Sequence, residues 1–240
     1  MSTTRAAAKT ARTVKKKTKK GAKGSRAPAG LTPEKIRDEA LALIDADGVE
    51  EFSTRKLGRA LGCEAMAIYW YYPSKDALLD AVVEALVSRM AGPPGEIAGG
   101  DWVGALRKVA HAYRRLAHAH PKAFPLLATR RFATDGTFEF LEGLFELARA
   151  QGIADRTTAR FFRVVSSYCS GVALDEIAGL REATDPKPAA VRAKFARVAA
   201  VSTWLEPKHY DDVFSFGLEI LLDALTREAG EPREARGKGR

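Results

Sequence analysis

The feature that most constrains this chain is the helical spacing of its apolar residues, which continues through most of the sequence. In the stretch 33–47, Ile36, Ala40, Leu43 and Ile44 recur at the interval that marks one face of a helix. Comparable patterns cover about 53–61, 64–71, 74–90, 101–119, 121–131, 137–151, 155–180, 188–203 and 209–228, with glycine or proline near the breaks. No segment alternates apolar and polar residues over a useful length, as a strand would. The sequence therefore predicts an all-α fold.

Composition divides the chain into five segments. Residues 1–30 hold ten basic residues and no acidic one, so the net charge of +9 is concentrated there, and this composition predicts a disordered basic tail. Residues 31–90 carry the first helical patterns, and the glycine- and proline-rich stretch 91–100 is the expected linker. Residues 101–228 form the second helical region, and the polar segment 229–240 is expected to be a disordered tail.

Several classes of protein are disfavoured by the sequence. No apolar run approaches the roughly 20 residues of a membrane-spanning helix. The basic N-terminal segment leads into no hydrophobic stretch of the kind found in secretory signals. Cys63 and Cys169 lie far apart in apolar helical contexts, which favours two buried thiols over a disulfide. We therefore predict a cytoplasmic protein with no membrane partner.

Residues 53–72 have the properties of a helix-turn-helix. Ser53 is a suitable N-cap for a short helix, and Gly62 permits a tight turn after it. Cys63 is small and apolar enough to fill the space between the two helices. The following stretch 65–72 has no acidic residue that would repel phosphate groups. An ordinary helical hairpin would show much the same spacing, so the pattern alone leaves both interpretations open.

The residue types at these positions favour a helix-turn-helix over an ordinary helical hairpin. The stretch from Ser53 to Glu64 reads STRKLGRALGCE, and the stretch from Ile68 to Leu79 reads IYWYYPSKDALL. Together they closely resemble the TetR family of bacterial repressors, and in particular its tetracycline-repressor branch. The resemblance covers about residues 33–90. It implies a three-helix helix-turn-helix DNA-binding domain over 31–90 and a helical effector-binding and dimerisation domain over 101–228.

The resemblance also implies roles for individual residues in contact with double-stranded DNA. The positions that match backbone-phosphate contacts are Thr54, Tyr69, Tyr71 and Lys75, and those that match base-facing positions are Arg55, Ala65, Met66 and Ala67. Arg55 could form a bidentate contact to guanine, worth about 1–3 kcal/mol of discrimination. The base-facing residues 65–67 offer only apolar contacts, for example to thymine methyl groups. Trp70 belongs to the same expected surface, although an indole would also pack well against the next helix.

The charge of the expected DNA-binding domain is unusual. Residues 33–90 hold seven basic and eleven acidic residues, whereas DNA-binding domains are usually basic. We hypothesise that the basic tail supplies the missing long-range attraction to phosphate groups. A solubilising leader and a transit peptide are the alternative interpretations of this tail.

Two late helical segments, 155–180 and 209–228, are long and apolar on one face. In the family, two such helices from each subunit form a four-helix bundle, so the resemblance implies a homodimer. A two-fold dimer would place its recognition helices roughly 34–36 Å apart and would require a palindromic operator. The alternative is that both helices lie entirely within one subunit's core.

The resemblance further implies a small-molecule effector, whose identity the sequence does not give. The residues expected to line its pocket are mostly aromatic: Trp102, His111, Phe124, Phe138, Phe145, Phe161, Tyr168 and Asp175. Aromatic residues at helical spacing lie more often in a core than in a pocket. Asp175 matches a metal-side acid of the tetracycline repressor. However, the matching stretch here, residues 123–127, contains no histidine to bind the metal. Ser167 also stands at a position where the tetracycline repressor has a histidine. We therefore predict neither a metal site nor a cofactor.

These observations favour a sequence-specific transcriptional regulator, a repressor released from its operator by an effector. No glycine-rich phosphate loop or Gly-x-Ser-x-Gly motif occurs, so no enzymatic activity is predicted. A nucleoid-type DNA-binding protein that acts through its lysine-rich tail is the alternative function. Activation instead of repression is also compatible with the sequence.

Overall fold

The computed structural model describes residues 30–91, 100–130, 132, 134–182 and 193–230, and all regular structure within them is helical. The elements are α1 (Pro33–Asp47), α2 (Thr54–Leu61), α3 (Ala65–Ile68), α4 (Lys75–Ala91), α5 (Trp102–Ala119), α6 (Phe124–Arg130), α7 (Asp135–Ala150), α8 (Asp155–Glu182), α10 (Ala196–Ser202), the 3₁₀ turn η1 (Pro207–His209) and α11 (Tyr210–Gly230). The all-α prediction is confirmed. The predicted tails and the interior of the linker lie outside the described residues.

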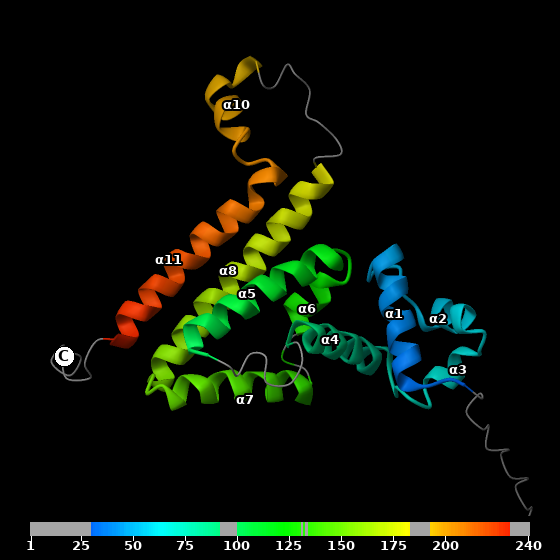
Figure 1. The fold of residues 1–240 in the computed structure, drawn as a ribbon. Coiled ribbons are helices and arrows are strands. Elements are labelled where there is room, and N and C mark those ends of the chain that lie inside the picture. Colours follow the sequence, from blue (N-terminus) through cyan, green and yellow to red (C-terminus); the bar gives the residue numbers. More distant parts are fainter. Residues whose placement is uncertain (1–29, 92–99, 131, 133, 183–192, 231–240) are drawn as a thin grey trace, which may run out of the picture.

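Helices α1, α2 and α3 form a small unit at one end of the molecule (Figure 1). The N-cap predicted at Ser53 is confirmed, because its side chain accepts a hydrogen bond from Lys56 N at 3.3 Å, and Thr32 caps α1 in the same way by accepting from Lys35 N at 3.2 Å. The core of this unit consists of fully buried apolar side chains contributed by all three helices and by α4: Ile36, Ile44, Leu57, Ile68 and Leu78. These side chains hold α2 and α3 in a fixed relation to α1 and α4, and they belong to the same core cluster as the rest of the molecule.

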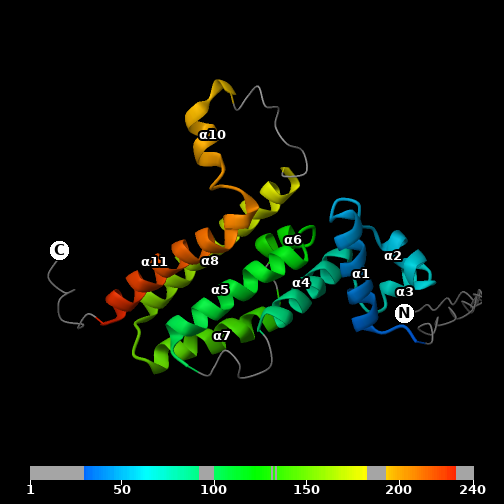
Figure 2. The same cartoon turned by 45° about the horizontal axis from the view of Figure 1, so that its top comes forward.

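The larger unit is built around α5, which packs against α4, α7, α8 and α11. Figures 1 and 2 show α8 and α11 running side by side, with α4 connecting the two units. Trp102, Phe124 and Phe214 are fully buried in this unit. Helix α10 projects away from the bundle in both views, and its segment exposes large apolar side chains, including Val198, Trp204 and Leu205.

Three helices differ from the sequence-based prediction by three residues or more at one end. The helix expected over 64–71 covers only residues 65–68, and the chain then enters a turn in which the amides of Tyr71 and Tyr72 both bond to Ile68 O at 3.0 Å. Helix α6 begins at Phe124 instead of 121, after a turn from His120 to Ala123. Of the helix expected over 188–203, residues 196–202 are helical and 183–192 lie outside the described residues.

Across the portions of the chain that the structure describes, no helix is long and apolar enough to span a membrane.

Candidate functional site

The turn between α2 and α3 is closely packed. Gly62 has a φ of 67°, in the left-handed region that glycine adopts readily, which confirms its predicted place in the turn. The amide of Cys63 bonds to Gly58 O at 2.9 Å, so the chain folds directly back over α2. A Cβ atom on Gly58 would lie 2.8 Å from Cys63 O. Both glycines are therefore required for the close approach of α3 to α2.

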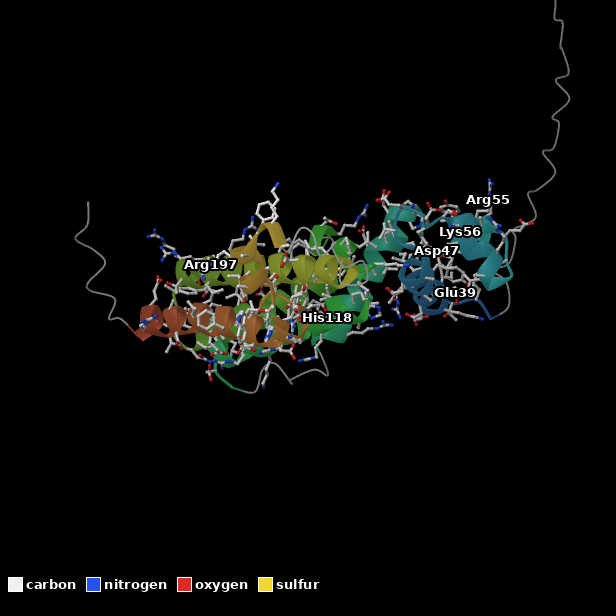
Figure 3. All side chains as sticks on the ribbon, turned by 90° about the horizontal axis from the view of Figure 1, so that it is seen from above. Glu39, Asp47, Arg55, Lys56, His118 and Arg197 are labelled. Atoms are coloured by element: carbon white, nitrogen blue, oxygen red, sulfur yellow. The ribbon has the colours of Figure 1, made fainter. Side chains whose placement is uncertain are left out.

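Several predicted DNA-contacting side chains lie on the exposed surface of this unit. Met66 and Trp70 are 69% and 62% exposed, which is unusual for such large apolar residues. Arg55 is exposed in the first turn of α2, and Figure 3 places it at the end of the molecule opposite Arg197 of α10. Three of the predicted DNA-contacting side chains are therefore accessible from solvent.

Two of the predicted phosphate-contacting residues are linked to each other in the same place. The hydroxyl groups of Thr54 and Tyr69 lie 3.2 Å apart, which joins the start of α2 to the end of α3. The remaining predicted residues of this segment, Ala65 and Ala67, are half-buried along α3. The surface that α2 and α3 present is therefore fixed by side chains as well as by the turn.

Other predicted phosphate contacts are engaged with the protein backbone. The Lys75 ammonium donates to Phe52 O at 2.8 Å and lies 5.4 Å from the centre of the Phe52 ring. The Tyr71 hydroxyl donates to Leu31 O at 2.7 Å. Lys75 keeps two further N–H groups for a phosphate, whereas the single proton of Tyr71 is already used. In this structure Tyr71 holds the start of α1 in place, and its contact with DNA stays a prediction.

The small unit is joined to the larger one by polar contacts at both ends of α6. At its start, Nδ1 of His120 lies 2.7 Å from Asp45 Oδ2 of α1, and the Lys122 ammonium donates to Ala46 O. At its end, Arg130 donates to Asp76 and Asp80 in the first turns of α4, at 2.6 and 3.0 Å. These carboxylates raise the pKa of Arg130, so its charge is secure. Movement of α6 would therefore be transmitted to both α1 and α4.

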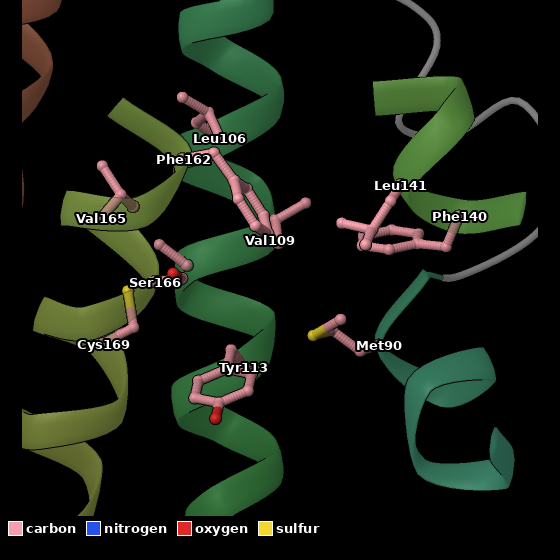
Figure 4. Close-up of a pocket in the computed structure, with 11 residues that line it drawn as sticks. Met90, Leu106, Val109, Tyr113, Phe140, Leu141, Phe162, Val165, Ser166 and Cys169 are labelled. Carbon is pink, nitrogen blue, oxygen red and sulfur yellow. The ribbon is translucent and has the colours of Figure 1, made fainter. Parts of the chain in front are cut away.

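A cavity of about 70 Å³ lies between α4, α5, α7 and α8 (Figure 4). Its lining residues are almost entirely apolar: Met90, Leu106, Val109, Ala110, Tyr113, Phe140, Leu141, Phe162, Val165, Ser166 and Cys169. Burial raises the pKa of the Cys169 thiol to about 12, in keeping with an environment that disfavours charge. The cavity is thus apolar, as ligand pockets usually are, although its volume is below their usual range of about 300–1,000 Å³.

None of the eight side chains that the sequence suggested for the effector pocket lines this cavity. Trp102 and Phe124 are fully buried in the core, whereas Phe138 and Asp175 are exposed. The other four side chains pack on neighbouring helices: His111 and Tyr168 against Phe214, Phe145 against Phe162, and Phe161 within the buried core. The structure thus does not bring the eight together, and their contact with an effector stays a prediction.

A buried charge cluster, which the sequence did not predict, links α5, α8 and α11. Glu176 is almost completely buried and accepts hydrogen bonds from Arg114 Nε at 2.8 and 3.0 Å. Its Oε2 atom also lies 2.6 Å from His118 Nε2. Arg114 donates in addition to Asp211 at the start of α11, and that bond lowers the pKa of Asp211. The cluster therefore ties α5, α8 and α11 to one another.

Within the described part of the chain, no group of three or more histidine, cysteine, aspartate or glutamate side chains is arranged to hold a metal ion. Asp175 points to solvent, one residue before the buried Glu176.

The structure combines a tightly packed helix-turn-helix, in which Arg55, Met66 and Trp70 are exposed, with a helical body that contains an apolar cavity. This arrangement is typical of two-domain DNA-binding regulators. The family model for the N-terminal domain of tetR-family bacterial regulatory proteins matches residues 36–82. The model for the tetracycline repressor-like C-terminal domain matches residues 94–228. The chain belongs to the TetR family and is a DNA-binding transcriptional regulator.

Among its relatives is the transcriptional repressor DrrR1 of Streptomyces coeruleorubidus, 26% identical over 85% of this chain and 81% of the relative. The class D tetracycline repressor of Escherichia coli is 31% identical over 50% of this chain and 62% of that protein. Among solved structures, a possible TetR-family regulator from Streptomyces coelicolor A3(2) is 27% identical, with a TM-score of 0.68 over 82% of this chain and 100% of that one. A TetR variant from Acinetobacter baumannii AYE in complex with minocycline is 25% identical, with a TM-score of 0.64 over 84% and 99% of the chains. These comparisons give no support to the nucleoid-type alternative.

Proposed function

We propose that this protein is a homodimeric repressor that binds a palindromic operator and is released when a small molecule enters the cavity between α4, α5, α7 and α8. The observation that carries the proposal is the exposed surface of α2 and α3 above a turn that two glycines keep tight. Arg55 is the side chain on this surface with the geometry to read guanine, while Thr54, Tyr69 and Lys75 would contact phosphates. Residues 31–90 and 101–228 would then be the DNA-binding and effector domains.

Homodimerisation is supported by the outer surface of α8 and α11. Val213, Phe216 and Ile220 recur along α11 and are half to largely exposed, with Phe216 at 70%. Val164 and Leu174 extend this apolar surface on α8. Exposed apolar patches of this kind usually mark an interface. The apolar residues on the opposite, inward face of the same two helices are buried within one subunit: Phe161, Val165, Phe214, Leu218, Leu222 and Leu225.

The dimer is tested by Phe216→Glu, which places a charge in the centre of the proposed interface. We expect this variant to sediment as a monomer and to lose cooperative binding to a two-half-site operator. Glu139→Lys changes the charge at an exposed position of α7 outside the patch, and it should leave the dimer intact. A dimeric Phe216→Glu protein would refute this interface.

Helix α4 links the cavity to the proposed DNA-binding surface. Met90 lines the cavity and belongs to α4, whose first turns are held by Arg130 of α6. Helix α4 also carries Leu78 into the core beneath α2 and α3. A ligand that displaces α4 would therefore tilt the reading surface and lower the affinity for the operator.

The relatives support repression as the direction of control, because those cited above are named as repressors, and the minocycline complex supports a small-molecule effector. The proposal assigns no catalytic activity to this chain. The proposal requires only that the effector change the relative populations of two arrangements of the helices. No covalent chemistry is needed for this.

The proposal is tested by selecting random duplex DNA with the purified full-length protein and determining which sequences become enriched. A two-fold-symmetric motif is expected, with half-sites about one helical turn apart. Arg55→Ala should flatten the preference at one guanine in each half-site while leaving weak binding to unrelated DNA. Tight, salt-sensitive binding without any enriched motif would overturn the proposal in favour of binding dominated by the basic tail.

A further inference from the structure

We infer that the effector of this regulator is an uncharged, predominantly apolar molecule that binds without a metal ion and is larger than the cavity it enters. The inference rests on the proposed function, because it assumes that the cavity between α4, α5, α7 and α8 is the effector site. It goes further by naming the chemical class of the ligand.

The lining of the cavity offers an ionised ligand no partner. The lining residues include no aspartate, glutamate, lysine, arginine or histidine. The polar side-chain atoms are the Tyr113 hydroxyl, the Ser166 hydroxyl and the Cys169 thiol. The first lies 3.0 Å from Ser170 Oγ, and the second donates to Arg163 O at 3.1 Å, so both already have protein partners. A charged group in this space would lose its hydration without a compensating ion pair.

Two basic side chains that follow Tyr113 on α5, Arg114 and His118, are paired with acidic groups outside the cavity lining. Arg114 follows Tyr113 on α5, but its guanidinium donates to Glu176 and Asp211. His118, one turn further along α5, also contacts Glu176. Turning either side chain toward the cavity would leave the buried Glu176 carboxylate without that partner, which is energetically unfavourable. The charge cluster therefore does not act as a reserve of counterions for the effector.

The size of the cavity adds a second constraint. At about 70 Å³ it is smaller than the roughly 150 Å³ that an apolar cavity needs to hold benzene. An aromatic or multi-ring effector can enter only if part of the wall moves. Met90 of α4 and Phe140 of α7 form the side of the cavity opposite α8 in Figure 4. Outward movement of Met90 would displace α4, so the volume of the effector itself would drive release from DNA.

Two fluorescent probes with the same ring system test the charge requirement. N-phenyl-1-naphthylamine is neutral at pH 7, and 8-anilinonaphthalene-1-sulfonate is the same skeleton with one sulfonate. We expect the neutral probe to bind the full-length protein about 100-fold more tightly than the sulfonate, because the sulfonate must be desolvated without a partner. Addition of a chelator should leave the affinity for the neutral probe unchanged. Equal affinities, tighter binding of the sulfonate, or a requirement for magnesium would overturn the inference.

A matched pair of variants locates the bound probe. Ser166→Leu fills the cavity, whereas Ser167→Leu makes the same change at the next, exposed position of α8. The neutral probe should bind at least about tenfold more weakly to the first variant and be unaffected in the second. Val109→Ala, which enlarges the cavity, should bind the probe more tightly. A gain in affinity at this position is a result that misfolding would not produce. Probe binding that is insensitive to Ser166→Leu would overturn the assignment to this cavity.

The same protein separates this inference from the proposed function. Specific binding to the selected operator is measured first without a probe, and then with increasing neutral probe. A protein that binds the operator but neither binds the neutral probe nor responds to it refutes only the ligand class. A protein that binds the probe in the cavity but recognises no specific DNA refutes the proposed function instead.

Discussion

Arg130 and Asp76 form a 2.6 Å hydrogen-bonded ion pair that joins the last turn of α6 to the first turn of α4. A second bond from Arg130 to Asp80 makes the guanidinium a clamp on two carboxylates. Asp76 follows Lys75, the proposed phosphate contact, so the clamp also neutralises acidic charge beside the proposed path of the DNA. Arg130 thus both ties α6 to α4 and neutralises acidic charge beside the proposed path of the DNA.

Replacing Arg130 with methionine should weaken binding to the operator by about tenfold at low salt. The substitution leaves Asp76 and Asp80 without their cation near the phosphates, where like charges repel. Fluorescence anisotropy with a labelled operator measures the effect. Arg149→Met, which removes an exposed arginine paired with Glu146 on α7, is the matched control and should bind normally. If the two variants bind alike, the clamp has no part in DNA affinity.

Gly58→Ala should destabilise the helix-turn-helix by about 1–3 kcal/mol and abolish specific binding to DNA. The added Cβ atom would lie 2.8 Å from Cys63 O, so α3 must move away from α2. Gly143→Ala on α7 is the control, because its Cβ atom would meet nothing within 4 Å. That variant should be slightly stabilised, by up to about 1 kcal/mol. Thermal denaturation of both proteins measures the contrast, and equal melting temperatures would contradict it.

Arg55→Ala should lower the affinity for the selected operator by about 1–3 kcal/mol while affinity for unrelated DNA falls much less. The exposed guanidinium in the first turn of α2 is expected to contact a base edge and not only phosphates. Competition binding with operator and scrambled duplexes separates the two effects. Arg197→Ala, on the projecting α10, removes a comparable exposed charge far from this surface. If the affinity for both duplexes falls equally, Arg55 contacts only phosphates.

Removal of residues 1–29 should flatten the salt dependence of DNA binding. This segment carries ten basic residues and no acidic one, whereas residues 33–90 have an excess of acidic residues. For each DNA phosphate that the tail no longer neutralises, the slope of log affinity against log salt concentration should become shallower by about 0.9. The truncated protein should keep its sequence preference, since Arg55 and α3 are untouched. An unchanged slope would show that the tail makes no contact with DNA.

Acidification below about pH 6.5 should destabilise the fold in part through His111. Burial against the Phe214 ring, 5.2 Å away, and the nearby Arg115 and Arg114 lower the pKa of His111, against the opposing effect of Glu219. The unfolded chain therefore binds a proton before the folded one does, and stability falls as the pH drops through 6.5. His111→Gln should show a smaller drop in melting temperature between pH 7.5 and 5.5. An identical drop would rule out His111 as a contributor.

The parts of the fold that depend on neighbours in sequence could be predicted from it. The caps at Thr32 and Ser53 and the turn at Gly62 follow from local rules, and the family resemblance rests on the same short stretch. The partners of Tyr71 and Lys75 could not be predicted, because Leu31 O and Phe52 O are 40 and 23 residues away. Such contacts depend on how whole helices pack.

The cavity could not be predicted from the sequence for a related reason. A cavity is the space that packing leaves unfilled between four helices, and no residue type marks it. The large aromatic side chains Trp102 and Phe124 fill the core completely, whereas the cavity walls include small residues such as Ala110 and Ser166. A similar shift separates the exposed Asp175 from the buried Glu176, because one residue turns a helix by about 100°.

The bond from Tyr71 to Leu31 O fixes the point at which the basic segment joins the folded protein, directly beside α3. The strength of attraction to DNA and the choice of sequence can therefore evolve separately. The number of lysines before Leu31 can change while the residues of α2 and α3, which are proposed to read the operator, stay the same. Natural variation in such regulators could thus adjust how long they stay on DNA without changing which genes they control.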